Sequence, residues 1–367
     1  KEFDKFGKDK KFFVRTYGCQ MNEHDSEKIK GMLKSVGFSE SDDINDADIV
    51  ILNTCAIREN AHDKVFGFLG VLKHMKQSKP NLLIGLCGCM AQEEVVVNDI
   101  LNKYKYVDFV CGTHNLDNML SIIKNKIDTD KRQIEVLSYE GDVVEGVPVV
   151  RDSKYSAWID IIYGCDKFCT YCIVPYTRSR KHEDIVSEVE TLVKDGYKEV
   201  TLLGQNVNAY GKDLYDNYNL ADLLKDVSDT GIERIRFVTS HPWDFTDSMV
   251  DIIASRDNIM PYIHLPLQSG SNKILKLMNR KYTSEEYLKL YNSIRDKVKD
   301  SSVTTDIIVG FPGETEEDFE ETLKIVNECK FDGAFTFAYS PRENTPAALM
   351  KDAIRESVKM DRLHRLN

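Results

Sequence analysis

The sequence lacks long apolar stretches. Runs such as residues 49–52 and 307–309 are far shorter than the ~20 apolar residues that a membrane-spanning helix needs. The first residues, Lys-Glu-Phe-Asp-Lys, carry charges where a secretion signal would have its apolar core. We therefore expect a cytoplasmic protein without a membrane partner.

Proline and glycine are also sparse, with 9 and 20 residues in a chain of 367, which excludes collagen-like and linker-like chains. Hydrophobic residues make up 42% and charged residues 30%, a composition that permits a buried core. At roughly 150 residues per domain, the length predicts two or three domains. The net charge of -11 argues against a surface that coats nucleic acid throughout, but a local basic patch remains compatible with it.

The nine cysteines are an odd number in a chain that shows no export signal. A disulfide framework is therefore a poor explanation, and metal or redox chemistry is a better one. Eight of the nine precede residue 173, and they form one tight and one dispersed group.

Short apolar strands alternate with amphipathic helices through residues 1–127. Strand-like runs cover residues 11–17, 47–53, 82–86 and 107–110, and helix-like runs cover 23–36, 58–77, 92–104 and 116–127. This α/β alternation predicts an N-terminal doubly wound domain, with a parallel sheet and helices on both faces.

Residues 128–153 interrupt the alternation with charges, glycine and proline, and we predict a linker there. Six further strand-like runs follow, at residues 157–163, 199–204, 234–239, 262–267, 303–309 and 334–339, with helix-like runs between them. Six β/α units in a row predict a partial (β/α) barrel over residues 154–367.

The tight group, Cys165, Cys169 and Cys172, has the spacing C-x3-C-x2-C and follows the first predicted strand of the second domain. Thiolates ligate iron–sulfur clusters, and a 4Fe–4S cluster normally takes four of them. Three thiolates on one loop would leave one iron open to a small chelating molecule. Structural zinc with His182 as a fourth ligand is one alternative, and inert thiols are another.

This run resembles the signature of the radical S-adenosylmethionine (SAM) family, in its usual place after the first strand of a six-unit barrel. The resemblance implies that Cys165, Cys169 and Cys172 hold a 4Fe–4S cluster whose open iron is chelated by SAM. It also implies reductive cleavage of SAM to methionine and a 5′-deoxyadenosyl radical. The cofactor supplies that chemistry, while the protein orients it and excludes solvent.

The dispersed group includes Cys19, Cys55 and Cys89, each just after a predicted strand of the first domain. Since the carboxyl ends of parallel strands meet at one edge, these thiols could form a second three-ligand site. Cys111 also follows a strand, and Cys87 lies two residues before Cys89, so position alone does not select three of the five. Burial as small apolar residues is the alternative for the whole group.

An N-terminal domain with these cysteine contexts, joined to a radical SAM barrel, resembles the methylthiotransferases. The resemblance implies that Cys19, Cys55 and Cys89 ligate an auxiliary 4Fe–4S cluster, and that Cys87 and Cys111 do not. All six matched cysteines are then catalytic.

Within that family the chain resembles the tRNA-2-methylthio-N6-dimethylallyladenosine synthase branch along nearly its whole length. Eleven stretches match in order: 17–22 (YGCQMN), 53–60 (NTCAIREN), 64–70 (KVFGFLG), 88–92 (GCMAQ), 164–177 (GCDKFCTYCIVPYT), 199–211 (EVTLLGQNVNAYG), 234–242 (RIRFVTSHP), 264–271 (HLPLQSGS), 278–283 (MNRKYT), 305–315 (TDIIVGFPGET) and 337–346 (FAYSPRENTP).

The resemblance implies methylthiolation at C2 of an N6-isopentenyl-adenosine next to the tRNA anticodon, with two SAM molecules and two clusters. The implied partners are the tRNA anticodon stem-loop and a low-potential electron donor, and we expect a monomer. One alternative is the branch that acts on threonylcarbamoyl-adenosine of tRNA. The other is a two-cluster electron carrier without catalysis.

Two features depart from the family pattern. The family usually reads Thr-Arg-Gly-Arg after the cluster loop, whereas this chain has Ser179 in place of the glycine, which is comfortable only at negative φ. Family members also end in a small RNA-binding β-barrel, and we expect that module to be absent from this chain.

The resemblance places SAM at the carboxyl ends of the barrel strands. The candidates are Tyr171, Gln205, Asn206, Ser240, Gln268, Gly310 and Tyr339. Turns and helix caps are the alternative for such polar residues.

A basic run beside the cluster loop, Arg178, Arg180 and Lys181, is the candidate RNA contact. Arginine and lysine bind phosphate, and aromatic rings stack on unpaired bases. Tyr171 and Tyr176 lie nearby in sequence. A solvated surface run is the alternative.

Overall fold

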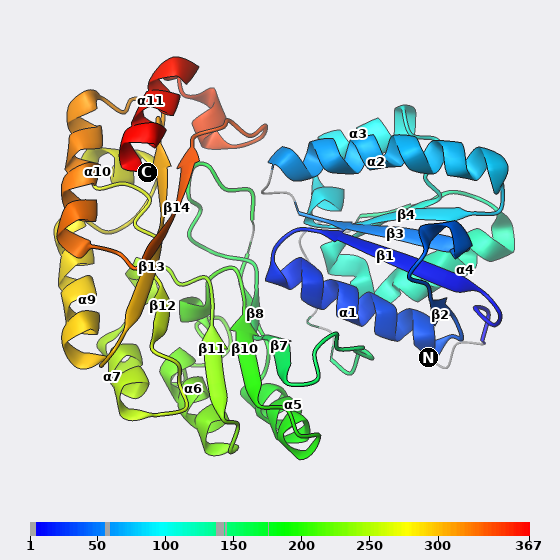
Figure 1. The fold of residues 1–367 in the computed structure, drawn as a ribbon, viewed down its shortest axis with the longest axis horizontal. Helices are drawn as coiled ribbons and strands as arrows, with labels where there is room; N and C mark the ends of the chain where they lie inside the picture. The colour runs from blue at the N-terminus through cyan, green and yellow to red at the C-terminus, as the bar shows by residue number, and fades with distance from the viewer. Residues whose placement is uncertain (1–4, 56–58, 137–142, 144, 175) are drawn as a thin grey trace. The chain divides into compact units, whose positions relative to one another are not determined.

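The computed structural model describes residues 5–55, 59–136, 143, 145–174 and 176–367 (Figure 1). The chain divides into two compact units, Lys1–Lys154 and Tyr155–Asn367. In the described part of the chain, no helix combines the length and apolar character needed to cross a membrane.

The first unit is built on one six-stranded parallel sheet. Its strand order is β2-β1-β3-β4-β5-β6. The strands are β1 (Lys11–Tyr17), β2 (Ser39–Glu40), β3 (Ile49–Thr54), β4 (Leu83–Gly88), β5 (Phe109–Gly112) and β6 (Gln133–Glu135). The order reverses between β1 and β3, as in doubly wound folds, so the predicted fold class of this part is confirmed.

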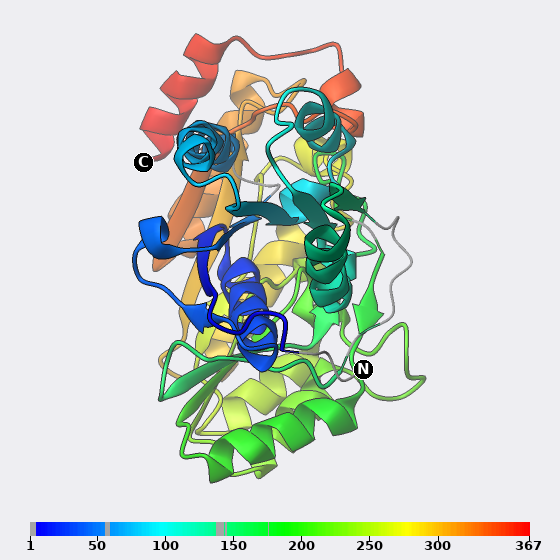
Figure 2. The ribbon, with the colours of Figure 1, turned by 90° about the vertical axis from the view of Figure 1, so that its right-hand side faces the viewer.

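Helices cover both faces of this sheet (Figure 1). They are α1 (Gln20–Ser35), α2 (Glu59–Ser78), α3 (Glu94–Asn102) and α4 (Met119–Thr129). Ile49 and Ile51 of β3 belong to the core with α1 and α4, whereas Val50 and Leu52 belong to the core with α2 and α3. Burial on both faces explains why β3 reads as a continuous apolar run. The turned view separates the two helix layers from the sheet between them (Figure 2).

The segment predicted as a linker, residues 128–153, differs from that prediction. It contains β6, which pairs with β5 as the edge strand of the sheet, and the Lys30 ammonium of α1 lies 2.9 Å from the Asp152 carboxylate. Short, half-exposed edge strands carry little apolar pattern, which is why the sequence concealed this one.

The second unit is a partial barrel of six parallel strands in two three-stranded sheets. The strands are β7 (Ser156–Asp160), β10 (Glu199–Leu203), β11 (Arg234–Phe237), β12 (Tyr262–His264), β13 (Ser302–Val309) and β14 (Gly333–Ala338). A parallel bridge from Ile235 to Ile259 joins β11 to the segment that leads into β12. The predicted partial barrel is confirmed.

Most helices in the described part of this unit form its outer layer (Figure 1). They are α5 (His182–Lys194), α6 (Leu220–Asp229), α7 (Asp247–Ser255), α9 (Ser284–Lys297) and α10 (Glu316–Cys329). α9 and α10 each begin at a capping box, in which a threonine and an acidic residue three positions on satisfy free backbone N–H groups. Two further helices, α8 (Asn272–Leu277) and α11 (Glu356–Leu366), complete the unit.

Candidate cluster and SAM sites

The tight cysteine group lies on a loop whose two ends are tied together. The loop runs from β8 (Ile162–Tyr163) to β9 (Arg178–Ser179), which pair antiparallel. The pKa of the Cys165 thiol is raised to about 11, chiefly by burial, and the nearby Cys169 and Cys172 act in the same direction. The three thiols therefore lie close enough to interact.

Backbone groups of this loop are held by side chains from other parts of the barrel. The Gly164 N–H donates to Gln205 Oε1 at 2.8 Å, and Asn279 Nδ2 donates to the carbonyl of Phe168 at 2.8 Å. Gly164 and Phe168 both have positive φ, at 72° and 50°, a region that glycine adopts freely and phenylalanine rarely. The contacts fix the loop in a conformation that it would not hold alone.

Four of the predicted SAM residues bury a polar side-chain atom that has no hydrogen-bond partner among the described residues. The atoms are Asn206 Oδ1, Ser240 Oγ, Gln268 Oε1 and Tyr339 OH, and their residues are 1%, 4%, 8% and 8% exposed. They follow β10, β11, β12 and β14, at the carboxyl ends of the strands. Buried polar atoms are nearly always satisfied in proteins, so this edge has the donors and acceptors that a polar ligand requires.

Backbone strain marks the same strand ends. Thr239 and Gln268 both have φ of +67°, in the left-handed region that β-branched and long side chains avoid. Such conformations cost ~1–3 kcal/mol each and gather at ligand sites. Gln268 therefore has both a strained backbone and a side-chain oxygen without a hydrogen-bond partner among the described residues.

His241 is a residue of this edge that the sequence analysis did not single out, although it lies in the matched stretch 234–242. Its Nδ1 accepts the Trp243 N–H at 3.2 Å, which leaves the proton on Nε2, a buried atom without a partner in the described ranges. Burial lowers the pKa of His241 below its usual value, and the charges of Arg280 and Lys167 lower it further. The ring is therefore a neutral N–H donor.

Aromatic rings connect the cluster loop to the ends of β13 and β14. The Tyr171 ring lies 6.3 Å from the Phe311 ring, and the Phe311 ring lies 5.0 Å from the Tyr339 ring, both edge to face. Gly310, directly after β13, has φ of +71°, and its N–H donates to Glu314 Oε1 at 2.8 Å. The structure thus brings Tyr171, Gly310 and Tyr339 into one region.

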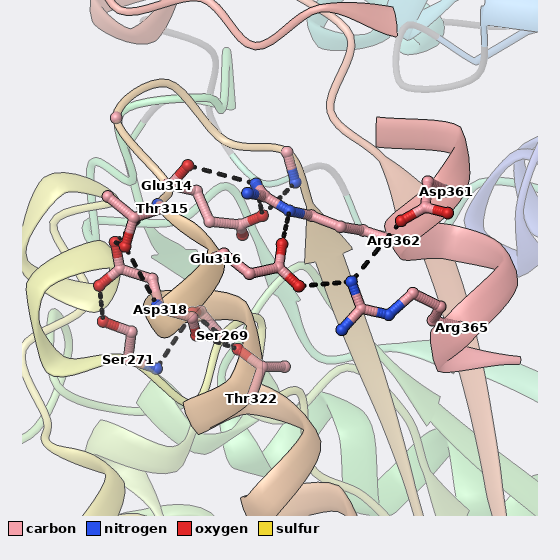
Figure 3. A network of polar contacts seen from close by, with 12 residues as sticks. Ser269, Ser271, Glu314, Thr315, Glu316, Asp318, Thr322, Asp361, Arg362 and Arg365 are labelled. Atoms are coloured by element: carbon pink, nitrogen blue, oxygen red, sulfur yellow. Dashed lines mark hydrogen bonds and ion pairs between the residues drawn. The ribbon is translucent and has the colours of Figure 1, made fainter. Parts of the chain in front are cut away.

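Helix α11 holds this region in place through charged side chains (Figure 3). Arg362 pairs with Glu314 at 2.7 Å, and both side chains are buried. Lys359 Nζ donates to the carbonyl of Tyr339 at 2.8 Å. Because Glu314 also binds the Gly310 N–H, α11 fixes both the turn after β13 and the end of β14.

The dispersed cysteines Cys19, Cys55 and Cys89 all lie at one edge of the first sheet. They follow β1, β3 and β4, which are neighbours in the sheet, and the strand order reverses between β1 and β3. Ligands of doubly wound sheets bind at this switch point, beyond the carboxyl ends of the strands.

Cys87 and Cys111 are placed differently. They lie inside β4 and β5, directly opposite one another, and both are fully buried in the core shared with α1 and α4. Burial raises the pKa of both thiols. Position in the strand thus separates these two cysteines from the three at the edge.

Asn22 is a second residue that sequence reasoning missed, although it ends the matched stretch 17–22. Its Oδ1 accepts the Cys19 N–H at 3.2 Å and lies 3.5 Å from Cys19 Sγ. The pKa of Cys89 is raised to about 11, chiefly by burial; the nearby Asp25 and Cys19 act in the same direction, and the nearby Asn22 side chain opposes them. One buried amide therefore contacts two of the three edge thiols.

Across the described ranges, no set of three or more His, Cys, Asp and Glu side chains is already arranged to hold a metal ion. The two thiol groups are therefore identified by their chemistry and their placement, rather than by a closed coordination shell.

Comparisons with known proteins identify the family of the chain. The model of the Radical SAM superfamily matches residues 159–326, and that of the "Uncharacterized protein family UPF0004" matches residues 11–112. The tRNA-2-methylthio-N(6)-dimethylallyladenosine synthase of Staphylococcus haemolyticus is 55% identical over 371 residues, which cover 100% of this chain and 72% of the relative. The synthase of Staphylococcus aureus (strain JH9) is 55% identical over 366 residues, or 98% of this chain and 71% of the relative.

This chain belongs to the tRNA-2-methylthio-N6-dimethylallyladenosine synthase family. It is a radical SAM enzyme, so the predicted family and enzyme class are confirmed, as are SAM and 4Fe–4S clusters as its cofactors.

Solved structures show the same fold at low identity. The radical SAM methyltransferase TsrM from Kitasatospora setae matches with a TM-score of 0.64 and 14% identity, over 93% of this chain and 75% of that one. The cobalamin-dependent radical SAM enzyme OxsB matches with a TM-score of 0.60 and 13% identity, over 96% of this chain and 56% of that one. Both span the two units of the present chain.

The serine in place of the usual family glycine fits its position. Ser179 is not among the described residues with positive φ. Its N–H and hydroxyl both donate to the Asp213 carboxylate, at 2.8 Å and 2.5 Å. The serine hydroxyl therefore adds a contact with Asp213 without backbone strain.

The predicted RNA contacts Arg178, Arg180 and Lys181 do not share one environment. Arg180 is 7% exposed, and its guanidinium donates to the carbonyl of Asp160 at 2.8 Å and pairs with Glu188 at 3.0 Å. The prediction for Arg180 is thus corrected to a structural role, because its charge is already used inside the barrel. Lys181 is exposed at the start of α5, and Arg178 is half-buried.

Proposed function

We propose that this protein methylthiolates C2 of N6-isopentenyl-adenosine beside the tRNA anticodon, with SAM and two 4Fe–4S clusters. One observation carries the proposal: each unit places three cysteines at the edge where its fold binds ligands. The printed name of relatives that are 55% identical supports the substrate. An enzyme that uses a tRNA substrate and a low-potential electron donor would act in the cytoplasm.

In the second unit, Cys165, Cys169 and Cys172 would hold one cluster, which supplies the electron that cleaves SAM. The chain's own residues bind and orient that SAM. The unsatisfied atoms of Asn206, Ser240, Gln268, Tyr339 and His241 are available to its polar groups. Gln205 holds the loop at Gly164, and Tyr171 and Gly310 line the same region.

In the first unit, Cys19, Cys55 and Cys89 would hold the auxiliary cluster, and Asn22 would orient two of these ligands. Burial of Cys87 and Cys111 inside the core supports leaving them out of the ligand set.

The RNA must present its target base outside the stack, because a stacked base is closed to chemistry at C2. Exposed Lys181 and half-buried Arg178 lie next to the cluster loop. There they would bind phosphates of the anticodon loop and set its position.

Replacing the two thiol groups separately tests the proposal. Cys165, Cys169 and Cys172 changed together to Ala should leave roughly half the iron and form no 5′-deoxyadenosine. The same change at Cys19, Cys55 and Cys89 should also halve the iron, but should keep SAM cleavage and stop methylthiolation. Cys111→Ala is the matched control and should keep all the iron.

The outcomes also separate the alternatives. SAM cleavage by the wild type rules out an electron carrier, and no turnover of isopentenyl-adenosine tRNA together with turnover of threonylcarbamoyl-adenosine tRNA would overturn the substrate assignment. Loss of iron from Cys111→Ala to the extent seen with Cys89→Ala would overturn the ligand assignment.

A further inference from the structure

We propose that Arg280 supplies the counter-charge of the cluster on the barrel loop, and that its hydrogen bond to Cys169 raises the reduction potential of that cluster. The inference rests on the cluster site proposed above. It adds a residue that touches a ligand thiol rather than SAM or RNA, so Arg280 is a positioning residue that acts through Cys169.

The observation behind this inference is a buried cation without a carboxylate. Arg280 is 7% exposed, and within the described residues no Asp or Glu lies at ion-pair distance from it. Its Nη1 lies 3.6 Å from Cys169 Sγ, Nη2 donates to the carbonyl of Pro266 at 3.1 Å, and Nε donates to Tyr282 OH at 3.1 Å.

An unpaired buried charge is costly, so proteins rarely keep one without an anion nearby. A guanidinium does not shed its proton to escape that cost. Of the three groups that Arg280 touches, a carbonyl, a phenol and a thiol, only the thiol becomes a stable anion, which it does as a metal ligand. The surroundings of Arg280 are therefore complete only when Cys169 is a thiolate.

The guanidinium is also held where it is. The Arg280 N–H donates to the carbonyl of Leu275 at 2.8 Å, and the guanidinium carbon lies 5.3 Å from the centre of the Tyr282 ring. The Tyr282 hydroxyl donates in turn to the carbonyl of Leu267 at 2.8 Å. Asn279, the preceding residue, binds the loop carbonyl of Phe168, so one short segment fixes both the loop backbone and the charge beside its thiol.

The electrostatic consequence has a definite sign. Reduction moves one electron from the external low-potential donor onto the cluster, and Arg280 keeps its proton throughout. A fixed positive charge next to a ligand sulfur stabilises the reduced, more negative state over the oxidised one. Hydrogen bonds to the sulfurs and local charge are known determinants of cluster potential. Removing Arg280 should therefore make the cluster harder to reduce.

The experiment measures potential at constant iron. The full chain with Cys19, Cys55 and Cys89 changed to Ala carries only the barrel cluster, and its midpoint potential is read by a redox titration followed by electron paramagnetic resonance. In that background, Arg280→Met should make reduction at least tenfold less favourable, a shift of ~59 mV or more to negative potential. Arg280→Lys keeps the charge and should fall between the two.

Arg295→Met is the matched control, since it removes a guanidinium of the same unit that pairs with Asp332; its potential should equal that of the parent. If Arg280→Met retains too little iron, the midpoint potentials of Arg280→Gln and Arg280→Lys are compared at equal iron content. These two variants again differ in the charge of the side chain. An unchanged potential in Arg280→Met, or in Gln relative to Lys, overturns the inference. A parent without iron would instead overturn the cluster assignment on which the inference rests.

Discussion

At the scale of single residues, burial at the barrel strand ends fixes protonation states. His241 is 6% exposed, and burial together with the neighbouring charges of Arg280, Lys167 and Lys212 lowers its pKa. The folded protein therefore keeps the ring neutral at pH values where an unfolded chain would bind a proton there. This difference makes stability depend on pH.

We expect the free energy of unfolding to fall as the pH drops below ~6.5, the pKa of histidine in an unfolded chain. The unfolded state then binds a proton at His241 that the folded state does not bind. The free energy of unfolding should therefore fall by at most ~1.4 kcal/mol per pH unit. His241→Gln should show a smaller loss between pH 7.5 and 5.5 in urea unfolding of the metal-free protein. His74→Gln, on an exposed position of α2, is the control and should keep the wild-type slope. Equal slopes for His241→Gln and wild type would contradict the prediction.

Residue-level prediction from the sequence reaches positions at strand ends, whose role in SAM binding stays a prediction, and it misses contacts between residues far apart in the sequence. Asn206, Ser240, Gln268 and Tyr339 were named as SAM candidates because the family resemblance places SAM at the carboxyl ends of the barrel strands. Arg280 touches a thiol 111 residues earlier in the chain, and no local pattern announces such a contact.

At the scale of elements, α11 shows how a helix can act on a site without entering it. Its buried pair Arg362–Glu314 (Figure 3) holds the end of β13. Its contact from Lys359 to the Tyr339 carbonyl holds the end of β14. Removing one partner of a buried pair leaves an uncompensated charge.

Arg362→Met should therefore lower the free energy of unfolding by ~3 kcal/mol and weaken SAM binding, because the turn from Gly310 to Glu314 loses its support. Arg365→Met removes an exposed arginine of the same helix and should cost at most ~1 kcal/mol, with SAM binding intact. Urea unfolding and calorimetric titration with SAM make the comparison. Equal effects of the two substitutions would mean that the buried Arg362–Glu314 pair does not support the proposed SAM site.

The limits of prediction at this scale follow from apolar content. Strands with several buried side chains, such as β10 and β13, were found within a residue, since these side chains face packed helices. The two-residue β2 and the three-residue β6 lie at the edges of the sheet and bury too little apolar surface to show a pattern. β6 was therefore taken for linker.

At the scale of the whole molecule, the negative net charge opposes the binding of RNA. A net charge of -11 repels a polyanion, so RNA binding must rely on local cations. Arg180 is engaged inside the barrel, which leaves Lys181 as an exposed cation beside the cluster loop.

Lys181→Ala should weaken binding of a modified anticodon stem-loop and flatten the dependence of log Kd on log salt by about one. Lys198→Ala is the control, because Lys198 is paired with Glu233 and precedes β10, at the opposite end of the strands. Titrations at two salt concentrations test both. Identical slopes for wild type and Lys181→Ala would exclude a phosphate contact at this lysine.

The ladder of β8 and β9 bears on the order in which the enzyme matures. By pairing the two ends of the cysteine loop, folding closes a ring of chain at an entropic cost of ~2 kcal/mol. Many small metal domains run the other way, with ions driving the collapse of their ligands. Because the strand pairing joins the two ends of this loop without a metal ion, we expect iron to bind after the loop has folded.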